Sequence, residues 1–240
     1  MKKAFAIILA LCMVLSLAAC GGGKTTPANN SNAAPANNSG NTTPANSGSN
    51  TPSVNPAADD KGPDWGKKDG SVYTNEYYNL KVTLPSDWQF QNDEQVAGIM
   101  GADADVFTKK TIKEVAKGGT GTIYMMQAVA PGGANVIIAT SYHSSYDSFK
   151  ETDILAILKD SQAENLKNAE SGFKTVEYKT VNFAGQDKQV VHIARSASGI
   201  DLHQYMVIIA KGTDYIGIVT ITQVGAEEDA SIWNMFSTLK

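Results

Sequence analysis

Apolar and polar residues alternate along a short stretch in the first half of the chain. Residues 80–84 read Leu, Lys, Val, Thr, Leu, and Pro85 follows directly. This period of two predicts a strand with one face in the core and one face in water. Residues 72–74 are predicted to be its antiparallel partner, joined to it through a turn at Asn75 and Glu76.

Longer apolar stretches rich in β-branched residues predict most of the sheet. Residues 122–130 and 135–142 flank a Pro-Gly-Gly sequence that is typical of a hairpin turn. Beyond Gly172 the pattern predicts four further strands joined by short loops: residues 174–183, 189–196, 202–210 and 215–222. Because loops this short join antiparallel neighbours, these segments predict an antiparallel sheet.

Two short helices are predicted between the first hairpin and the second. Asp93 is predicted to cap a helix that runs through Met100. Thr108 is predicted to cap a second helix that ends at Gly118 and Gly119. Helices inserted among hairpins indicate an α+β fold rather than a parallel α/β fold.

Two more helices are predicted from apolar residues that recur at helical spacing. One lies near residues 148–168 and ends at Gly172, with a shared apolar face made by Ile154, Leu155, Leu158 and Leu166. The other closes the chain, with Ile232, Met235, Phe236 and Leu239 at i, i+3, i+4 and i+7. Acidic residues 227–229 lie at its predicted start, which suits the helix dipole. The predicted fold is therefore an antiparallel β-sheet flanked by helices.

The N-terminus has the pattern of a secretory signal. Lys2 and Lys3 precede an uncharged, mostly apolar stretch over residues 4–17. As a helix this stretch would span about 21 Å, which is short of the hydrocarbon core of a bilayer, about 30 Å. A basic start and a short apolar segment are typical of a signal peptide, so residues 1–19 are predicted to be removed.

Residues 17–21 read Leu-Ala-Ala-Cys-Gly, which resembles the lipobox of bacterial lipoproteins. In that family a diacylglycerol is attached to the cysteine thiol, and a peptidase cleaves just before that cysteine. The resemblance implies cleavage between Ala19 and Cys20, lipidation of Cys20, and durable attachment to the extracytoplasmic face of the cell membrane. The alternative is an ordinary cleavage site beside an unmodified cysteine. Because Cys12 is the only other cysteine and leaves with the signal, no disulfide or thiolate metal site is predicted.

The rest of the chain divides into a tether and a domain. Residues 20–65 are rich in Asn, Pro, Ser, Thr, Ala and Gly and contain almost no large apolar residue. Such a segment cannot bury enough apolar surface to fold, so it is predicted to be a disordered tether with a reach of about 35–40 Å. Residues 66–240 have the composition and length of a single globular domain.

Charge excludes two classes of site. The chain has 20 basic and 24 acidic residues, and the loss of residues 1–19 leaves 18 basic residues and a charge of −6. An acidic protein of this kind is not predicted to bind nucleic acid, whose phosphates select basic surfaces. Arg195 is the only arginine, which excludes a phosphate or carboxylate clamp built from paired guanidinium groups.

Two motifs at the start of the domain carry a second resemblance. Residues 72–80 read Val-Tyr-Thr-Asn-Glu-Tyr-Tyr-Asn-Leu, and residues 84–88 read Leu-Pro-Ser-Asp-Trp. This opening is similar to that of PsbP-like domains in clostridial and related Gram-positive lipoproteins, and the predicted element order over roughly residues 70–240 fits that family. The resemblance implies a PsbP-like α/β/α sandwich. It implies no catalytic residue, because the functional residues of the photosynthetic members match no motif in this chain.

Common catalytic motifs are absent from the sequence. It contains no Gly-x-Ser-x-Gly or His-Glu-x-x-His motif, no phosphate-binding glycine loop and no dinucleotide fingerprint. Residues 143–147, His-Ser-Ser-Tyr-Asp, are interpreted as turn and cap residues rather than a nucleophile with its base. Asp103 and Asp105 lack the later ligands of a calcium loop and are interpreted as part of a helix junction.

Two groups of residues are candidates for binding. His192 and His203 are predicted on neighbouring strands and could approach each other as a two-ligand metal site, but ordinary strand positions are the preferred interpretation. No metal, cofactor or catalytic residue is therefore predicted. The aromatic group is either an exposed patch for a glycan or protein, or, as we prefer, side chains packed on the sheet; it comprises Trp65, Tyr73, Tyr77 and Tyr78.

Two functions of different class remain. The first is a membrane-anchored extracytoplasmic lipoprotein with a non-catalytic binding or accessory domain for an envelope protein or a cell-wall partner. The second is an extracytoplasmic hydrolase or metal-dependent enzyme, which would need carboxylates or histidines that converge in a pocket. A solute-binding component of an importer is disfavoured, because such proteins usually have two lobes and a longer chain.

Overall fold

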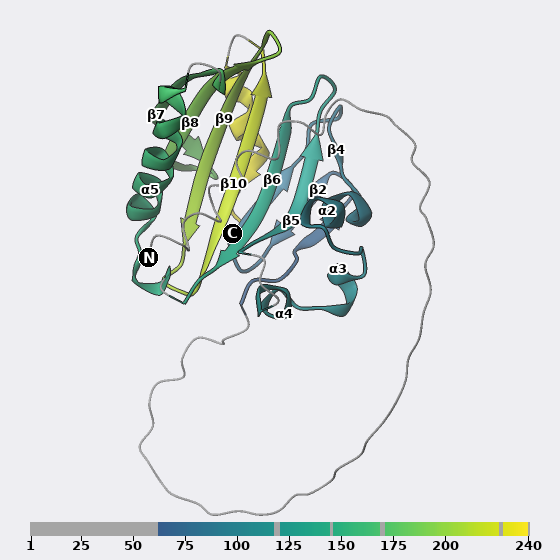
Figure 1. Ribbon diagram of the computed structural model, residues 1–240. Helices are drawn as coiled ribbons and strands as arrows, with labels where there is room; N and C mark the ends of the chain where they lie inside the picture. Colours follow the sequence, from purple (N-terminus) through teal and green to yellow (C-terminus); the bar gives the residue numbers. More distant parts are fainter. Residues whose placement is uncertain (1–61, 118–120, 145, 169–170, 226–227, 240) are drawn as a thin grey trace, which may run out of the picture.

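The computed structural model describes residues 62–117, 121–144, 146–168, 171–225 and 228–239 (Figure 1). The predicted signal peptide, Cys20 and nearly all of the predicted tether lie outside these residues, as do Gly118 and Gly119. No helix among the described residues has the length and apolar character needed to cross a bilayer.

A small antiparallel sheet forms around the first hairpin. Val72 lies opposite Thr83, which confirms the predicted pairing, but Asn75 is the last residue of the strand opposite Leu80 and the turn spans residues 76–79 rather than Asn75 and Glu76. Residues just before the sheet pack against it, since the Tyr73 hydroxyl donates to the carbonyl oxygen of Trp65 at 3.0 Å. The strands, in spatial order, are β1 (Lys67–Asp69), β2 (Val72–Asn75), β3 (Leu80–Thr83) and β11 (Phe236–Ser237).

A second, larger sheet carries most of the core, and each neighbouring pair of its strands is antiparallel. The predicted strands of this sheet are confirmed. The central pairing of β6 with β10 joins the hairpin β5–β6 to the later strands. In spatial order the strands are β4 (Gln89–Phe90), β5 (Thr122–Val129), β6 (Asn135–Tyr142), β10 (Tyr215–Val224), β9 (Ile200–Ala210), β8 (Gln186–Ala197) and β7 (Phe173–Phe183).

Helices cover one face of the large sheet. Helix α5 (Glu151–Ala163) buries its apolar side chains against β8, β9 and β10, and α2 (Asp93–Met100) packs on β5 and β6. Both helices lie on the same face of the sheet. Ala139, which belongs to the apolar core under α2, is directly opposite Ile218, which belongs to the apolar core under α5. Figure 1 shows α5 near the β7 edge of the sheet and α2 near β5.

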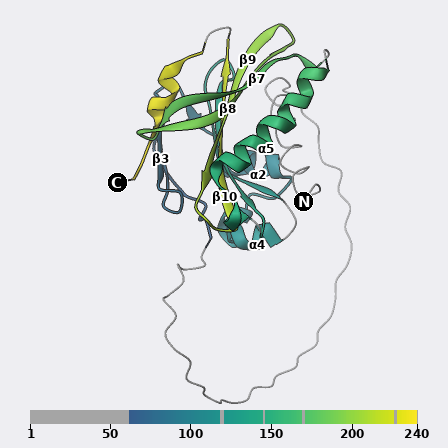
Figure 2. The same cartoon turned by 90° about the vertical axis from the view of Figure 1, so that its left-hand side faces the viewer.

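The small sheet covers the opposite face. Tyr73, Leu80 and Val82 are fully or almost fully buried against large-sheet residues that include Val136 and Val219. Figure 2 shows the long strands between α5 and β3. The layers are therefore helices, large sheet and small sheet, so the predicted mixture of antiparallel sheet and helices is confirmed.

The short helices differ from prediction. The N-cap of α2 is Asn92 rather than Asp93, because Asn92 and Gln95 form a reciprocal capping box with both bonds at 2.9 Å. The prediction of a helix capped by Thr108 is wrong. Thr111 instead caps α4 (Ile112–Lys117) in a second box with Glu114, so the segment breaks into α4 and the preceding α3 (Val106–Lys109).

The predicted long helix is shorter than its pattern indicated. It is preceded by the 3₁₀ turn η1 (Tyr146–Ser148), and beyond Ala163 it tightens into the 3₁₀ turn η2 (Glu164–Lys167). Leu166 is therefore off the apolar face, and it is 40% exposed. The residues that do reach the sheet are Ile154, Leu155 and Leu158.

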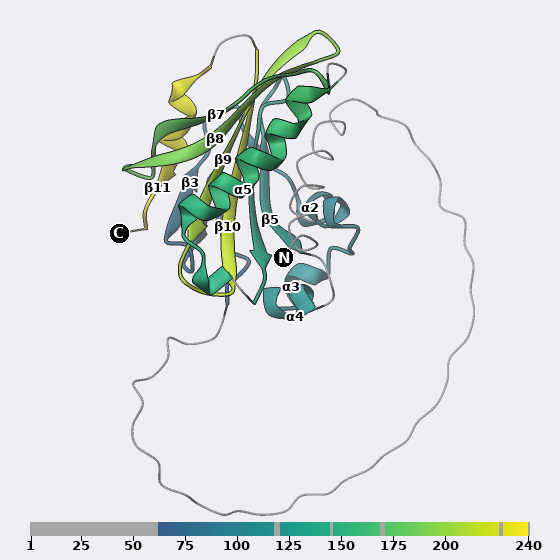
Figure 3. The ribbon, with the colours of Figure 1, turned by 60° about the vertical axis from the view of Figure 1, so that its left-hand side comes forward.

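The prediction of an α-helix at the end of the chain is wrong. The chain forms a 3₁₀ helix, η4 (Ala230–Met235), and then the strand β11. Ile232 and Met235 are both buried because i and i+3 lie on one side of a 3₁₀ helix. Phe236 instead leaves the helix, pairs with Val82 of β3 and packs on Phe183, with ring centroids 4.8 Å apart. Figure 3 shows this segment with η4 near β7 and β11 beside β3.

Candidate functional site

The sequence candidates outside the two histidines have structural roles. Tyr73 and Tyr78 are buried, and Trp65 and Tyr77 are half-buried and pack against the same core, which confirms packing on the sheet rather than an exposed patch. The Tyr146 amide donates to the carbonyl oxygen of His143 in a turn at 2.9 Å, as expected for that segment, while Ser145 lies outside the described residues. Gly101 ends α2 in a left-handed conformation, so the interpretation as a helix junction is confirmed.

His192 and His203 lie together on the face of the large sheet that carries the small sheet. They are diagonal neighbours, because His192 of β8 is opposite Tyr205 of β9 and His203 is opposite Ala194. His192 Nε2 and His203 Nδ1 are 3.1 Å apart, and the two ring planes differ by 2°. Strand register therefore brings together two residues that are eleven positions apart in the sequence.

Glu177 orients His192, which is the more buried of the two histidines. It lies on β7 directly opposite His192, and its Oε1 is 3.1 Å from His192 Nδ1. Because a carboxylate only accepts, Nδ1 carries the proton and Nε2 is directed at His203. Burial, which exceeds the opposing effect of Glu177, lowers the pKa of His192. The His192 side chain is 3% exposed, so its neutral form is favoured.

Glu228 approaches both histidines from outside the sheet. Its Oε1 lies 3.8 Å from His192 Nε2 and 3.7 Å from His203 Nδ1. The next residue is held in place by the buried side chain of Gln223 on β10. The Gln223 amide donates to the Asp229 carbonyl at 2.6 Å and accepts from the Asp229 amide at 2.9 Å. This pair of bonds fixes the backbone from which Glu228 extends.

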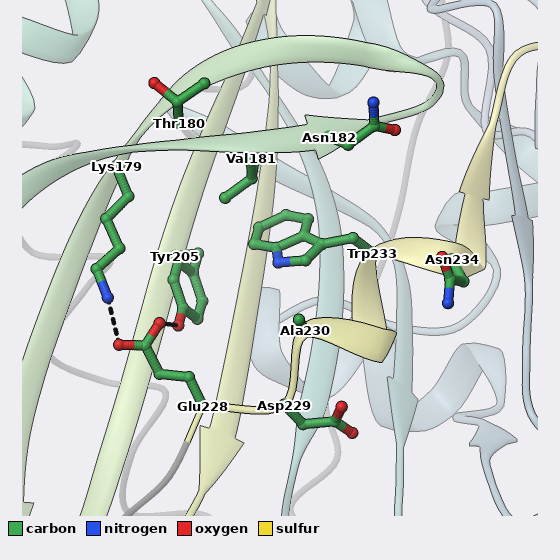
Figure 4. A pocket seen from close by; sticks show the side chains of 10 residues that line it. All are labelled: Lys179, Thr180, Val181, Asn182, Tyr205, Glu228, Asp229, Ala230, Trp233 and Asn234. Carbon is green, nitrogen blue, oxygen red and sulfur yellow. Dashed lines mark hydrogen bonds and ion pairs between the residues drawn. The ribbon is translucent and has the colours of Figure 1, made fainter.

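Tyr205 and Lys179 complete the polar contacts of Glu228. The Tyr205 hydroxyl donates to Glu228 Oε2, and the Lys179 ammonium is paired with Glu228 Oε1 (Figure 4). Burial opposes ionisation of Glu228, but the hydrogen bonds from Lys179 and Tyr205 hold its pKa below the usual value. Burial, reinforced by Glu228, raises the pKa of Tyr205. The result is an ionised carboxylate beside two imidazole nitrogens.

A cavity of about 470 Å³ opens beside this cluster, between β7, β9 and η4. Its lining includes Lys179 and Val181 of β7, Trp233 of η4, and Glu228. Figure 4 shows the indole of Trp233 beside Val181 and Tyr205. The rings of Tyr205 and Trp233 meet edge to face at 5.2 Å between centroids. The cavity thus offers aromatic surface next to a paired ammonium and carboxylate.

Sequence reasoning named the histidines but missed the residues that make them a site. Glu177 and Tyr205 have a sequence signal, since each is directly opposite His192 once the strand register is known. Glu228 was assigned only to a helix start, and Lys179 was assigned no role. The contact of Glu228 with the sheet depends on the Gln223 bonds, for which the sequence carries no local pattern.

No family model and no curated protein matches the chain. Among solved structures, the chain is similar to a crystal structure from Bacteroides thetaiotaomicron VPI-5482, with 14% identity and a TM-score of 0.34. The match covers 67% of this chain and 45% of that one, so the chain spans less than half of that protein's length.

Proposed function

We propose that this chain is a membrane-anchored extracytoplasmic lipoprotein with a non-catalytic binding domain whose ligand is a soluble cell-wall fragment. The observation that carries the binding function is the cavity beside Trp233 and Tyr205. Its volume of about 470 Å³ lies within the range of small-molecule sites, about 300–1,000 Å³. The resemblance of residues 17–21 to a lipobox supports the anchor, with Cys20 as the lipidated residue and Ala19 before the cleavage point.

The chemistry of the cavity suits a ligand that combines sugar and peptide groups. Trp233, which is half-buried, presents aromatic surface that can pack on the apolar face of a sugar ring, and the buried ring of Tyr205, which is 2% exposed, packs edge to face against it. Lys179 and Glu228 supply a cation and an anion that can pair with the carboxylates and amines of a short peptide. The element order also supports the finer proposal of a PsbP-like domain, in which the small sheet rather than a second layer of helices covers the face opposite α5.

A tether of the composition found at residues 20–65 would hold such a domain away from the lipid surface. A flexible coil of that length has a reach of about 35–40 Å. The binding cavity would then meet cell-wall material rather than lipid headgroups. The mature charge of −6 agrees with this arrangement, because an acidic surface is not attracted to anionic lipid.

Thermal unfolding of the full chain in detergent, with and without soluble cell-wall fragments, tests the binding function. A specific ligand at 100 times its dissociation constant adds about 2.7 kcal/mol to the free energy of unfolding. Lys179→Gln is expected to reduce the shift, because it removes the cation that lines the cavity. Lys174→Gln is the matched control, since Lys174 on the same strand pairs with Asp201 and does not line the cavity.

Two results would contradict the proposal. One is the same melting temperature with and without fragments across a panel of sugars and peptides. The other is turnover of a fragment that disappears with a single polar-to-Ala substitution, which would replace the binding function by an extracytoplasmic enzyme. The anchor is tested separately by incorporation of a labelled fatty acid, which Cys20→Ser is expected to abolish.

A further inference from the structure

We infer that His192, His203 and Glu228 form a binding site for one divalent transition-metal ion, of which zinc is the best match. This inference goes beyond the proposed ligand cavity and stands whether or not that cavity accepts a cell-wall fragment. Two imidazole nitrogens and one carboxylate oxygen are a donor set that suits zinc, whereas calcium and magnesium select oxygen ligands. The three donor atoms come from β8, β9 and the segment after β10.

The spacing of the donor atoms fits a single ion. His192 Nε2 and His203 Nδ1 are 3.1 Å apart, and Glu228 Oε1 is 3.8 Å and 3.7 Å from them. Tetrahedral zinc with metal–nitrogen bonds of about 2.0–2.1 Å places neighbouring ligand atoms about 3.3–3.4 Å apart. The observed distances lie on both sides of that value. A small rotation of the Glu228 side chain, which is 35% exposed, would shorten the two longer distances, and a slight separation of the imidazole rings would lengthen the shorter one.

His192 already has the arrangement of a metal ligand. Its Nδ1 proton is held by Glu177, which leaves the Nε2 lone pair for the ion. A carboxylate that accepts from the other ring nitrogen is the usual outer partner of a metal-bound histidine, and it fixes both tautomer and ring orientation. In the hydrogen bond between the two rings, His203 Nδ1 donates to His192 Nε2, and a shift of this proton to His203 Nε2 would free Nδ1 as the second ligand.

The protein holds the third ligand in advance. The two Gln223 bonds to Asp229 position the backbone, and the Tyr205 hydroxyl binds Glu228 Oε2, which leaves Oε1 on the side of the histidines. Lys179 is the competing partner of Oε1 and must move when an ion binds. Its ammonium is also 3.8 Å from Glu177, so an alternative carboxylate is within reach.

Isothermal titration of the full chain with zinc chloride tests the site. Cys12 and Cys20 are replaced by serine in every protein so that no thiolate contributes, and no histidine tag is present. His203→Gln and Glu228→Gln are each expected to weaken zinc binding by more than about tenfold, the scale on which metal-site substitutions act. His192 itself is left unchanged because it is buried.

His143→Gln is the matched control, since it removes the remaining histidine of the chain. His143 follows the end of β6 that pairs with Tyr215, whereas His203 is opposite Gln223 at the other end of β10, about 26 Å away by strand rise. The zinc affinity of the His143→Gln variant is expected to equal that of the parent protein. Circular dichroism of each variant confirms that the comparison is between folded proteins.

Copper(II) provides a readout of the ligands themselves. Electron paramagnetic resonance of the copper-loaded parent is expected to show coupling to two nitrogens, and that of His203→Gln to one. The inference is overturned if the parent protein does not bind zinc. It is equally overturned if His203→Gln and His143→Gln bind zinc alike and the copper spectrum is the same in both.

Discussion

Gln223→Ala tests whether one buried side chain fixes the segment that carries Glu228. Gln223 is 5% exposed, and its amide makes both hydrogen bonds that join β10 to the backbone of Asp229. A hydrogen bond contributes about 1 kcal/mol net, so the loss of two lowers the free energy of unfolding by about 2 kcal/mol. Because Asp229 is an exposed residue, its freed backbone groups can bond to water, which keeps the cost from being larger.

The assay is urea denaturation followed by circular dichroism, with a thermal scan as a second measurement. For a domain of 150–250 residues, about 2 kcal/mol corresponds to a fall in melting temperature of about 4–8 °C. Gln189→Ala is the control, because Gln189 is an exposed glutamine on β8 and its removal is expected to change stability by less than about 0.5 kcal/mol.

A second readout separates this positioning role from general stability. Zinc affinity of Gln223→Ala is expected to fall toward that of Glu228→Gln, since the carboxylate is no longer held beside the histidines. Equal unfolding midpoints for Gln223→Ala and Gln189→Ala would show that the two Gln223 hydrogen bonds do not stabilise the fold. A zinc affinity equal to that of the parent would refute the positioning role.

Two other substitutions test the close backbone approach at Gly172 and the competition of Lys179 for Glu228. Gly172→Ala is expected to lower the melting temperature strongly, because Gly172 has φ of +72° and an added Cβ would lie 2.1 Å from the carbonyl oxygen of Ser196; Gly185→Ala, with φ of +80° but open space, is expected to cost much less in the same scan. Lys179→Gln is expected to strengthen zinc binding in titration, because it removes the cation that competes for Glu228, while it weakens binding in the cavity; weaker zinc binding would contradict the proposed competition.

The strands were predictable because their signal is local. Each alternates or concentrates β-branched residues, and short turns separate them, so hairpins such as β5–β6 follow from neighbouring residues. The pairing of β6 with β10 is different. Residues such as Ala139 and Ile218 meet across the sheet, and nothing in either segment specifies that contact.

The C-terminal segment was mispredicted for a related reason. Ile232, Met235 and Phe236 have the spacing of an α-helical face, and the same spacing is satisfied by a 3₁₀ helix followed by a strand. The free edge of β3 decides between them, because Phe236 can pair there with Val82 and pack on Phe183. Local periodicity does not include that tertiary contact.

The candidate site shows the same limit. His192 and His203 could be placed on adjacent strands from the sequence, yet their value as ligands depends on Glu177 and Glu228. Those carboxylates come from β7 and from the segment after β10, and the strand register and the Gln223 bonds bring them to the histidines. A binding site whose residues come from four separate segments leaves no motif of fixed spacing in the sequence.

The most direct test of the metal site is X-ray absorption at the zinc edge on the zinc-loaded full chain without thiols. We expect two imidazole nitrogens at about 2.0–2.1 Å together with oxygen ligands, and the loss of one imidazole in His203→Gln. A spectrum with oxygen ligands alone, or the same spectrum for the parent and His203→Gln, would contradict the assignment of His192, His203 and Glu228 as a zinc site.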